Sequence, residues 1–213
     1  QDQEAKTESF QIAISDTSAG DGYLSLPRGL KFHECKTLFE KTHWQGLLKT
    51  NFDEYLALIQ NNQEFMPRGL AETNTDYKQI IPYLIFAHQE RYFLMQRKQN
   101  SSEQRLAQKY SLGIGGHMRK EDLQHTSIFG WAQREFYEEI SYQGSFSIEP
   151  LGLLNLETTP VDQVHLGLVL LLKGDSDNIH IKSELQSGHL ATLDECKVRD
   201  LENWSAVVMK ELV

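Results

Sequence analysis

A short acidic segment near the centre of this 213-residue chain constrains its fold and chemistry most strongly. Glu135, Glu138 and Glu139 follow Arg134 in a stretch that we predict to be helical. At about 3.6 residues per turn, the three glutamates share one helix face. Like charges at these spacings destabilise a helix by about 0.3 kcal/mol per pair, so the cluster indicates a compensating cation. Oxygen ligands alone favour Mg²⁺, Mn²⁺ or Ca²⁺ over zinc.

A glycine-rich segment upstream separates this pattern from the acidic, solvated helix faces that are common in proteins. Gly113, Gly115 and Gly116 follow a strand-like run and precede the predicted helix. Glycine permits positive φ and lets the backbone approach a ligand closely. A strand, a glycine loop and an acidic helix in this order therefore favour a ligand site over a merely acidic surface.

This order resembles the motif of the Nudix hydrolases, the Nudix box. The family pattern runs Gly, five residues, Glu, seven residues, Arg-Glu, an apolar residue, any residue, Glu-Glu, any residue, Gly, and an apolar residue. Gly116 and Asp122 fit the opening, with Asp in place of Glu, and residues 134–139 match the centre fully. The resemblance implies a hydrolase fold and a divalent-metal site.

The edges of the box depart from the family pattern. Eleven residues instead of seven separate Asp122 from Arg134, which implies a four-residue insertion in the loop before the helix. We expect this insertion to carry Asp122 into solvent. Ser141 replaces the terminal glycine, and serine takes the left-handed conformation less easily, so we expect the helix to continue toward Gly144.

A closer likeness is to a subgroup described as predicted phosphoesterases of the MutT type. Residues 78–83, 113–117 and 160–167 carry it, and the match covers roughly residues 78–213. It implies a Nudix hydrolase domain at 79–213 with an α/β/α sandwich around a mixed sheet. Residues 1–78 are then an N-terminal, mostly helical extension that packs on this core.

The resemblance also implies roles for the box residues. Glu135, Glu138 and Glu139 are the expected ligands of Mg²⁺, or of Mn²⁺, and a backbone carbonyl near Gly116 completes the set. Arg134 is expected to orient a glutamate by a charge-assisted pair rather than to touch substrate. Glu138, Glu139 and Arg134 are thus the catalytic candidates, with a box glutamate preferred as general base.

Residues outside the box are candidates for substrate binding. Arg97 corresponds to an arginine that many family members place near the substrate phosphates, and Arg105 is its possible companion. Asp162 and His165 are rival general bases, because a group that titrates near neutral pH suits that task. For His117 and His165 the alternative is a hydrogen-bonded core histidine, and for the arginines a solvated side chain.

Composition excludes several other classes. The net charge of −9 and the pI near 5.4 oppose a broad basic surface for duplex nucleic acid. Cys35 and Cys196 have no zinc-ligand spacing, and we expect both to be reduced in a cytoplasmic protein. The longest aliphatic run, 168–172, is far shorter than the roughly 20 residues of a membrane span. The chain begins with Gln1, which leaves a removed leader open.

Hydrophobic periodicity predicts the elements around the box. The run 164–172 is almost continuously apolar, which is typical of a central strand covered on both faces. The apolar runs 80–87 and 92–96 flank a polar turn and predict a hairpin. We also predict strands at 10–15, 151–156 and 178–182, of which 151–156 pairs with the central strand. Helices are predicted at 35–48, 52–59, 127–141 and 201–212, the last with Trp204 on its apolar stripe.

Together these features predict a Mg²⁺-dependent hydrolase of a phosphoanhydride, such as a nucleoside diphosphate linked to another moiety. The alternative is a Nudix-fold module that binds a nucleotide-like ligand without cleaving it, and a third reading is a structural protein with an acidic surface. Isoprenoid diphosphate isomerase chemistry is not supported, because no cysteine lies near the glycine loop or the box helix. The expected partner is a small-molecule diphosphate, with neither membrane nor duplex nucleic acid, and a homodimer is left open.

Overall fold

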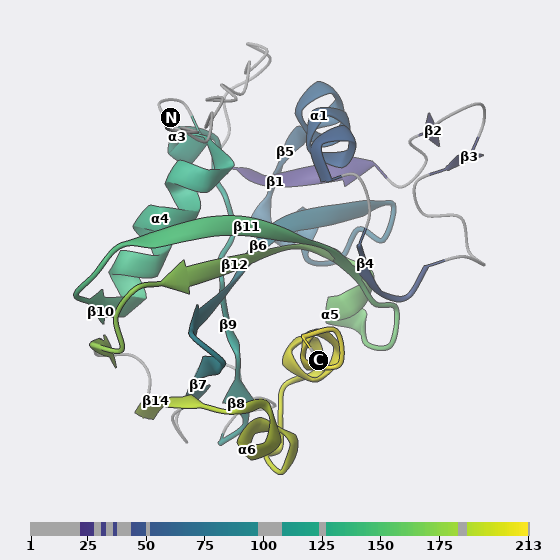
Figure 1. Cartoon of the computed structure of the whole chain (residues 1–213). Helices are drawn as coiled ribbons and strands as arrows, with labels where there is room; N and C mark the ends of the chain where they lie inside the picture. Colours follow the sequence, from purple (N-terminus) through teal and green to yellow (C-terminus); the bar gives the residue numbers. More distant parts are fainter. Residues whose placement is uncertain are drawn as a thin grey trace.

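The computed structural model describes residues 22–27, 31–32, 36–37, 44–49, 52–97, 108–123, 127–182 and 187–212 (Figure 1). Its strands are β1 (Gly22–Pro27), β2 (Lys31–Phe32), β3 (Lys36–Thr37), β4 (Gly46–Leu48), β5 (Glu64–Pro67), β6 (Tyr77–His88), β7 (Arg91–Gln96), β8 (Tyr110–Ser111), β9 (Gly113–Gly115), β10 (Ile140–Tyr142), β11 (Phe146–Asn155), β12 (His165–Gly174), β13 (Ile179–Ile181) and β14 (Ser187–Ala191). Its helices are α1 (Phe52–Asn62), α2 (Arg68–Ala71), α3 (Lys120–Leu123), α4 (Ile128–Glu139), α5 (Pro160–Gln163), α6 (Leu193–Lys197) and α7 (Asn203–Met209).

One large mixed sheet organises the molecule. Its main path runs β14-β7-β6-β12-β11-β4, and β1, β5, β8 and β9 join beside this path. Strands β6 and β12 are parallel, whereas β11 and β7 pair with their neighbours in antiparallel fashion. The predicted central strand is confirmed as β12, which lies between β6 and β11 and is buried along most of its length.

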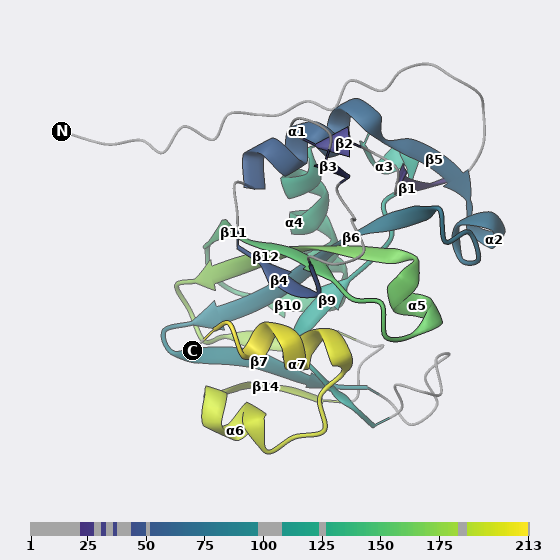
Figure 2. The same ribbon diagram turned by 90° about the vertical axis from the view of Figure 1, so that its right-hand side faces the viewer.

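Helices cover both faces of this sheet (Figures 1 and 2). Because successive strand residues point to opposite faces, Leu168 and Leu170 of β12 join the core beneath α1 and α4, whereas Val169 faces the core that includes Val208 of α7. The predicted α/β/α sandwich is therefore confirmed.

Two strand pairings were predicted correctly from alternation and turn residues. Strands β6 and β7 form the hairpin, with Ala87 opposite Tyr92, and Gln89 takes a positive φ of 54° in the turn. Strand β11 pairs with β12 as expected, although it is longer than the predicted 151–156. The predicted strand at 178–182 is β13, which pairs with β10 in a separate two-stranded sheet.

The box helix is α4, and its beginning is fixed by a side-chain cap. Ser127 precedes the helix, and its Oγ accepts a hydrogen bond from the Gly130 backbone N–H at 3.2 Å. The expectation that the helix continues toward Gly144 is wrong. Ile140 is buried and already extended, because β10 begins there and pairs with β13.

The N-terminal segment is only partly helical. The predicted helix at 52–59 is confirmed as α1, whereas the one predicted at 35–48 is wrong at its described residues, which form β3 and β4. Gly46 has a φ of +105°, and Leu48 pairs with Leu153 at the sheet edge. The predicted strand at 10–15 lies outside the described residues. Strands β1 and β4 join the same sheet as the core, and the division at residue 78 stays a prediction.

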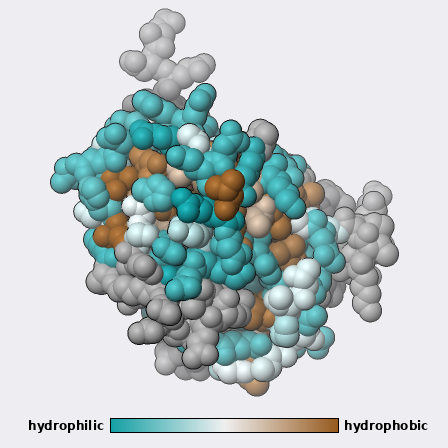
Figure 3. Space-filling view, turned by 90° about the horizontal axis from the view of Figure 1, so that it is seen from below, coloured by the Kyte–Doolittle hydropathy of each residue, from teal (hydrophilic) through white to brown (hydrophobic). Residues whose placement is uncertain are grey.

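The C-terminal helix is shorter than predicted. Helix α7 ends at Met209, and α6 precedes it on the same side of the sheet (Figure 2). Viewed from that side, hydrophobic residues are scattered among hydrophilic ones (Figure 3). Among the residues that the structure describes, no helix is long and apolar enough to cross a membrane.

Candidate functional site

The glycine loop brings the backbone into contact with the acidic helix. Strand β9 pairs with β6, and the chain then passes Gly116 on its way to α3 and α4. A Cβ atom at Gly116 would lie 2.6 Å from Oε1 of Glu135 and 3.2 Å from the Trp131 ring. A side chain at this position would displace the Glu135 carboxylate, which agrees with the close approach of the backbone that the glycines predict.

The shared face of the three glutamates has a marked electrostatic effect on Glu135. Burial, together with the smaller effects of the Glu138 and Glu139 charges, raises the pKa of Glu135 from 4.5 to about 7. Arg134 opposes this shift. A cation at this face would relieve the repulsion that disfavours the charged form of Glu135.

Arg134 links the box helix to the segment before it. Its Nη2 donates to Oδ1 of Asp122 at 2.8 Å, and its Nε lies 3.3 Å from Oε1 of Glu138, one turn along the helix. The expectation that Asp122 is carried into solvent is wrong. The Asp122 side chain is only 19% exposed, because α3 returns it to Arg134 and to the Arg119 N–H.

The acidic side chains have the right chemistry for a divalent ion, but they do not form a ligand cluster. Their carboxylate oxygens suit Mg²⁺ or Mn²⁺, and Gly116, which has no side chain, leaves space next to Glu135. Within the described part of the chain, no three His, Cys, Asp or Glu side chains are close enough together to hold a metal ion. Glu138 is instead engaged by Arg134. Metal ligation by Glu135, Glu138, Glu139 and Gly116 stays a prediction.

A cavity of about 360 Å³ adjoins the glycine loop on the α7 side of the sheet. Four of the five residues predicted to bind substrate line it, whereas Arg105 lies outside the described residues. The lining residues come from β6, the glycine loop, the α5 segment, the start of β12, the start of α7, and the positions after β7 and before β8. They are Ile81, Tyr83, Arg97, Lys109, Gly115, Gly116, His117, Thr159, Val161, Asp162, His165, Glu202, Asn203 and Trp204. Because Gly116 belongs to this lining and also contacts Glu135, the cavity and the acidic helix meet there.

His117 and His165 face each other in this cavity. Their Nε2 atoms are 3.2 Å apart, and Nδ1 of His165 lies 2.7 Å from the Val161 carbonyl oxygen. Burial, then the neighbouring His165, lowers the pKa of His117 to about 4, so its imidazole is neutral at physiological pH. The structure places the two predicted histidines together, and their role in binding stays a prediction.

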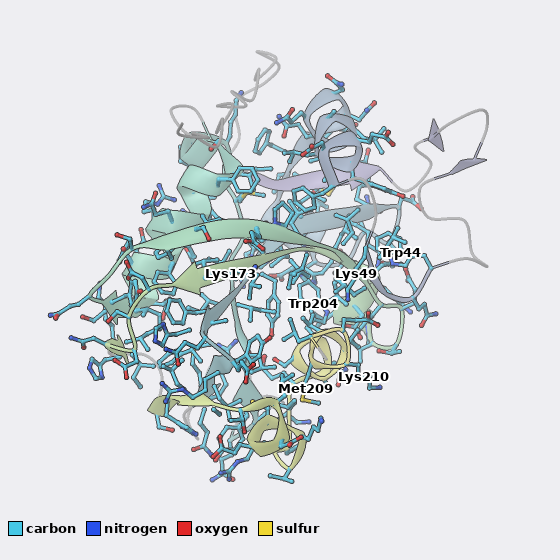
Figure 4. All side chains as sticks on the ribbon, viewed as in Figure 1. Trp44, Lys49, Lys173, Trp204, Met209 and Lys210 are labelled. Carbon is cyan, nitrogen blue, oxygen red and sulfur yellow. The ribbon has the colours of Figure 1, made fainter. Side chains whose placement is uncertain are left out.

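Asp162 is buried and accepts three side-chain hydrogen bonds. Its Oδ2 accepts from the hydroxyls of Thr158 and Thr159 at 2.6 and 2.7 Å, and its Oδ1 accepts from Trp204 Nε1 at 3.3 Å. These bonds give Asp162 a structural role, and its role as general base stays a prediction. The Oδ1 bond holds Trp204, which reaches from α7 toward the sheet (Figure 4).

The charged groups of the cavity are already paired. Nε of Arg97 lies 2.8 Å from Oε1 of Glu202, whose side chain is 10% exposed. Lys109 lies 3.4 Å from Oδ1 of Asp200. Both basic side chains of the described lining therefore have an acidic partner.

Comparisons with known proteins agree with this geometry. No family model matches the chain. The crystal structure of Tm1382, a candidate Nudix hydrolase, superposes with a TM-score of 0.69 at 29% identity, over 89% of this chain and 97% of that one. Protein YmaB of Bacillus subtilis is 32% identical over 169 residues, which are 73% of this chain and 81% of YmaB.

The chain belongs to the Nudix hydrolase family. The Nudix domain of Shewanella oneidensis NrtR, in a crystal structure with ADP ribose, shares the fold at a TM-score of 0.52 and 12% identity, over 76% of this chain and 96% of that one.

Several residues in or beside this candidate site could not be identified from the sequence. Trp204 was assigned to a packing stripe, and Lys109 and Glu202 carried no motif. Lys78, in the segment shared with the MutT-type subgroup, is fully buried, and its Nζ contacts the Leu156 and Asp162 carbonyl oxygens at 3.0 and 2.8 Å. The sequence contains one indication of this role: a lysine next to an apolar strand run, since a lysine that is buried needs polar partners.

Proposed function

We propose that this Nudix protein is a Mg²⁺-dependent hydrolase of a phosphoanhydride, a nucleoside diphosphate linked to another moiety. One observation carries the proposal. Gly116 contacts Glu135 on the acidic helix and also lines the cavity, so a diphosphate reaching Gly116 from the cavity comes next to the carboxylates.

Glu135, Glu138 and Glu139 are the side chains that would hold Mg²⁺. Bound Mg²⁺ neutralises phosphate oxygens and lowers the pKa of water, which the reaction needs. Arg134 keeps Glu138 oriented through the 3.3 Å pair and is itself fixed by Asp122 at 2.8 Å. A box glutamate is the preferred general base, since Asp162 Oδ2 is already held by the Thr158 and Thr159 hydroxyls.

The cavity supports a substrate with an uncharged, planar part. Arg97 is paired with Glu202, and Asp162 is satisfied, so these charges offer little to a second polyphosphate group. Trp204 supplies an aromatic ring, fixed by its bond to Asp162 and by an edge contact with Tyr83 at 5.5 Å between ring centroids. A nucleobase fits such a surface, and a cavity of about 360 Å³ lies in the size range of small-molecule sites. The NrtR domain's complex with ADP ribose shows that a related fold accepts this kind of molecule.

The second candidate is a module that binds the same ligand without cleaving it. The ungathered carboxylates, with Glu138 held by Arg134, favour it. The complete Arg134-Glu135 and Glu138-Glu139 pattern favours the hydrolase.

A substrate panel separates the two candidates. Purified protein with Mg²⁺ is assayed for product release from ADP-ribose, nucleotide sugars, dinucleoside polyphosphates and nucleoside triphosphates, and binding of each is measured in parallel by calorimetry. We expect cleavage of a nucleoside diphosphate linked to another moiety. Binding of such a ligand without product identifies the second candidate, and neither binding nor cleavage across the panel refutes both. Trp204→Ala should raise KM for the cleaved substrate at least about tenfold, because aromatic stacking contributes 1–3 kcal/mol per base, whereas Trp44→Ala, outside the cavity, should not.

A further inference from the structure

The two cavity histidines have the spacing of metal ligands. His117 comes from the glycine loop and His165 from the start of β12, and their Nε2 atoms are 3.2 Å apart. Two nitrogen ligands at the usual distance of about 2.0–2.1 Å from a tetrahedral ion lie about 3.3 Å apart. The rings are inclined at 63°, so each presents its Nε2 edge to the same small space rather than stacking.

The backbone fixes the tautomer of His165. The Val161 carbonyl oxygen can only accept a hydrogen bond, so the 2.7 Å contact places a hydrogen on Nδ1 of His165. Nε2 of the neutral ring then directs a lone pair toward His117. A carbonyl on the distal ring nitrogen is the usual way in which proteins orient a metal-ligating histidine. An anion between the two rings would need N–H groups from both, and His165 could supply one only as a cation.

A buried oxygen lies on the neighbouring strand. Gln79 of β6 is the parallel partner of His165, and partners in register present their side chains to the same face of a sheet. Its amide nitrogen donates to the Ala71 carbonyl, whereas Oε1 is buried without a hydrogen-bond partner among the described residues. Such an oxygen can accept a hydrogen bond from a metal-bound water.

We propose that His117 and His165 form a binding site for a transition-metal ion such as Zn²⁺, separate from the carboxylates of the box helix. Imidazole ligands favour zinc, cobalt, nickel and copper, whereas Mg²⁺ prefers oxygen. On binding, the Nε2 hydrogen of His117 moves to its Nδ1 through solvent, so that two lone pairs meet the ion and no net proton is released. The remaining coordination positions open to the cavity, where, if the proposed function holds, an oxygen of the diphosphate takes one of them.

Co²⁺ titration of the full chain in excess Mg²⁺ tests this site, because four-coordinate Co²⁺ absorbs visible light and Mg²⁺ saturates oxygen-only sites. We expect one equivalent of Co²⁺ to bind and to be displaced by Zn²⁺. His117→Gln and His165→Gln should each weaken binding at least about tenfold. His189→Gln, an exposed histidine on β14, and Glu138→Gln should leave the affinity unchanged.

Loss of Co²⁺ binding in Glu138→Gln, full affinity in both histidine variants, or no binding by the unaltered protein would each overturn the proposal. If the histidine variants do not fold, ¹⁵N spectra of the unaltered protein replace them: Zn²⁺ must shift Nε2 of both His117 and His165. Substrate is absent from these measurements. A protein that binds Co²⁺ but hydrolyses nothing therefore refutes the proposed function alone, and one that hydrolyses without binding Co²⁺ refutes this site alone.

Discussion

On the helix side of Gly116 like charges crowd together, whereas on the cavity side opposite charges are already paired. Burial, and then the neighbouring Glu138 and Glu139, raise the pKa of Glu135 to about 7. In the cavity Arg97 meets Glu202, and Asp162 accepts three side-chain hydrogen bonds. Both regions contain acidic and basic side chains, but the acids repel one another on the helix and are paired with basic groups or hydrogen-bond donors in the cavity.

This difference indicates what each region is suited to receive. Carboxylates on one helix face are stabilised by an added cation, because the cation removes their repulsion. The side-chain charges of Arg97 and Asp162 already have partners, so these two groups gain little from a further charged group. On our proposals the diphosphate therefore lies at Gly116, between the carboxylates and the two histidines, and the uncharged part of the ligand lies against Trp204.

The largest expected effect comes from replacing Lys78, which lies outside the cavity lining but holds the loop that carries Asp162. Its Nζ is fully buried and contacts Glu157 at 3.0 Å as well as two carbonyl oxygens of the same loop. Lys78→Met keeps the volume but leaves these acceptors unpaired, so we expect a loss of about 3 kcal/mol in the free energy of unfolding, measured by urea denaturation. Lys173→Met, at an exposed ion pair, is the control and should change stability by less than about 1 kcal/mol. A loss of less than about 1 kcal/mol for Lys78→Met contradicts the role of the paired charges.

The contact between the two regions can be broken at Gly116. In Gly116→Ala the new methyl group would lie 2.6 Å from Oε1 of Glu135, and the flexible glutamate must move away. We expect turnover to fall at least about tenfold, because ligand misplacement is costly in rate, with stability changed by about 1 kcal/mol. Gly69→Ala is the matched control, since open space surrounds that position. Equal turnover in the two variants would separate Glu135 from catalysis.

The crowding on the helix side can be measured without substrate. The folded-state pKa of Glu135 is raised from 4.5 to about 7, so the contribution of this group to stability is complete below pH 4.5 and is lost as pH rises through 7. In chelator at pH 8, Glu135→Gln should therefore raise the free energy of unfolding by about 1 kcal/mol, after allowance for solvent screening of a half-buried group. Thermal melts at pH 5 and pH 8 test this. A destabilised variant at pH 8 would mean that neither burial nor the neighbouring carboxylates disfavour the charged form of Glu135 in the folded protein.

The smallest effect is expected at Asp122. Asp122→Asn weakens the pair with Arg134, which is 47% exposed, so stability should change by less than about 1 kcal/mol. Turnover should fall a few-fold, because Arg134 orients Glu138 less well. Steady-state kinetics with the conservative Asp122→Glu variant, which restores the charge, distinguish this from a purely structural effect. Turnover unchanged in Asp122→Asn would make the pair incidental.

Elements with strong local patterns could be predicted from the sequence. The run 164–172 is apolar throughout because β12 is covered on both faces, and the β6–β7 hairpin has a clear polar turn. The box helix is marked by Ser127 at its beginning and by its spaced glutamates. These patterns are local in sequence, so they can be recognised without knowledge of tertiary contacts.

Features that depend on distant partners could not be predicted. Residues 46–48 fall within the helix predicted at 35–48, yet they pair with β11 at the sheet edge. Asp122 is held in place by its hydrogen bond with Arg134, and the insertion between the two residues made this contact impossible to predict from their spacing. The meeting of His117 with His165 and the place of Trp204 likewise depend on how the glycine loop, β12 and α7 pack, and no spacing in the sequence records this.

Metal dependence of the helix side tests the central claim most directly. Hydrolysis of the preferred diphosphate is measured in Mg²⁺, after EDTA, and after Mg²⁺ is restored, for the unaltered protein, Glu138→Gln and the exposed control Glu90→Gln. We predict that EDTA abolishes product release, that Mg²⁺ or Mn²⁺ restores it, and that Glu138→Gln lowers the rate at least about 100-fold while Glu90→Gln does not. Full activity in EDTA, or a Glu138→Gln rate equal to that of Glu90→Gln, would contradict the assignment of the cation to the acidic helix.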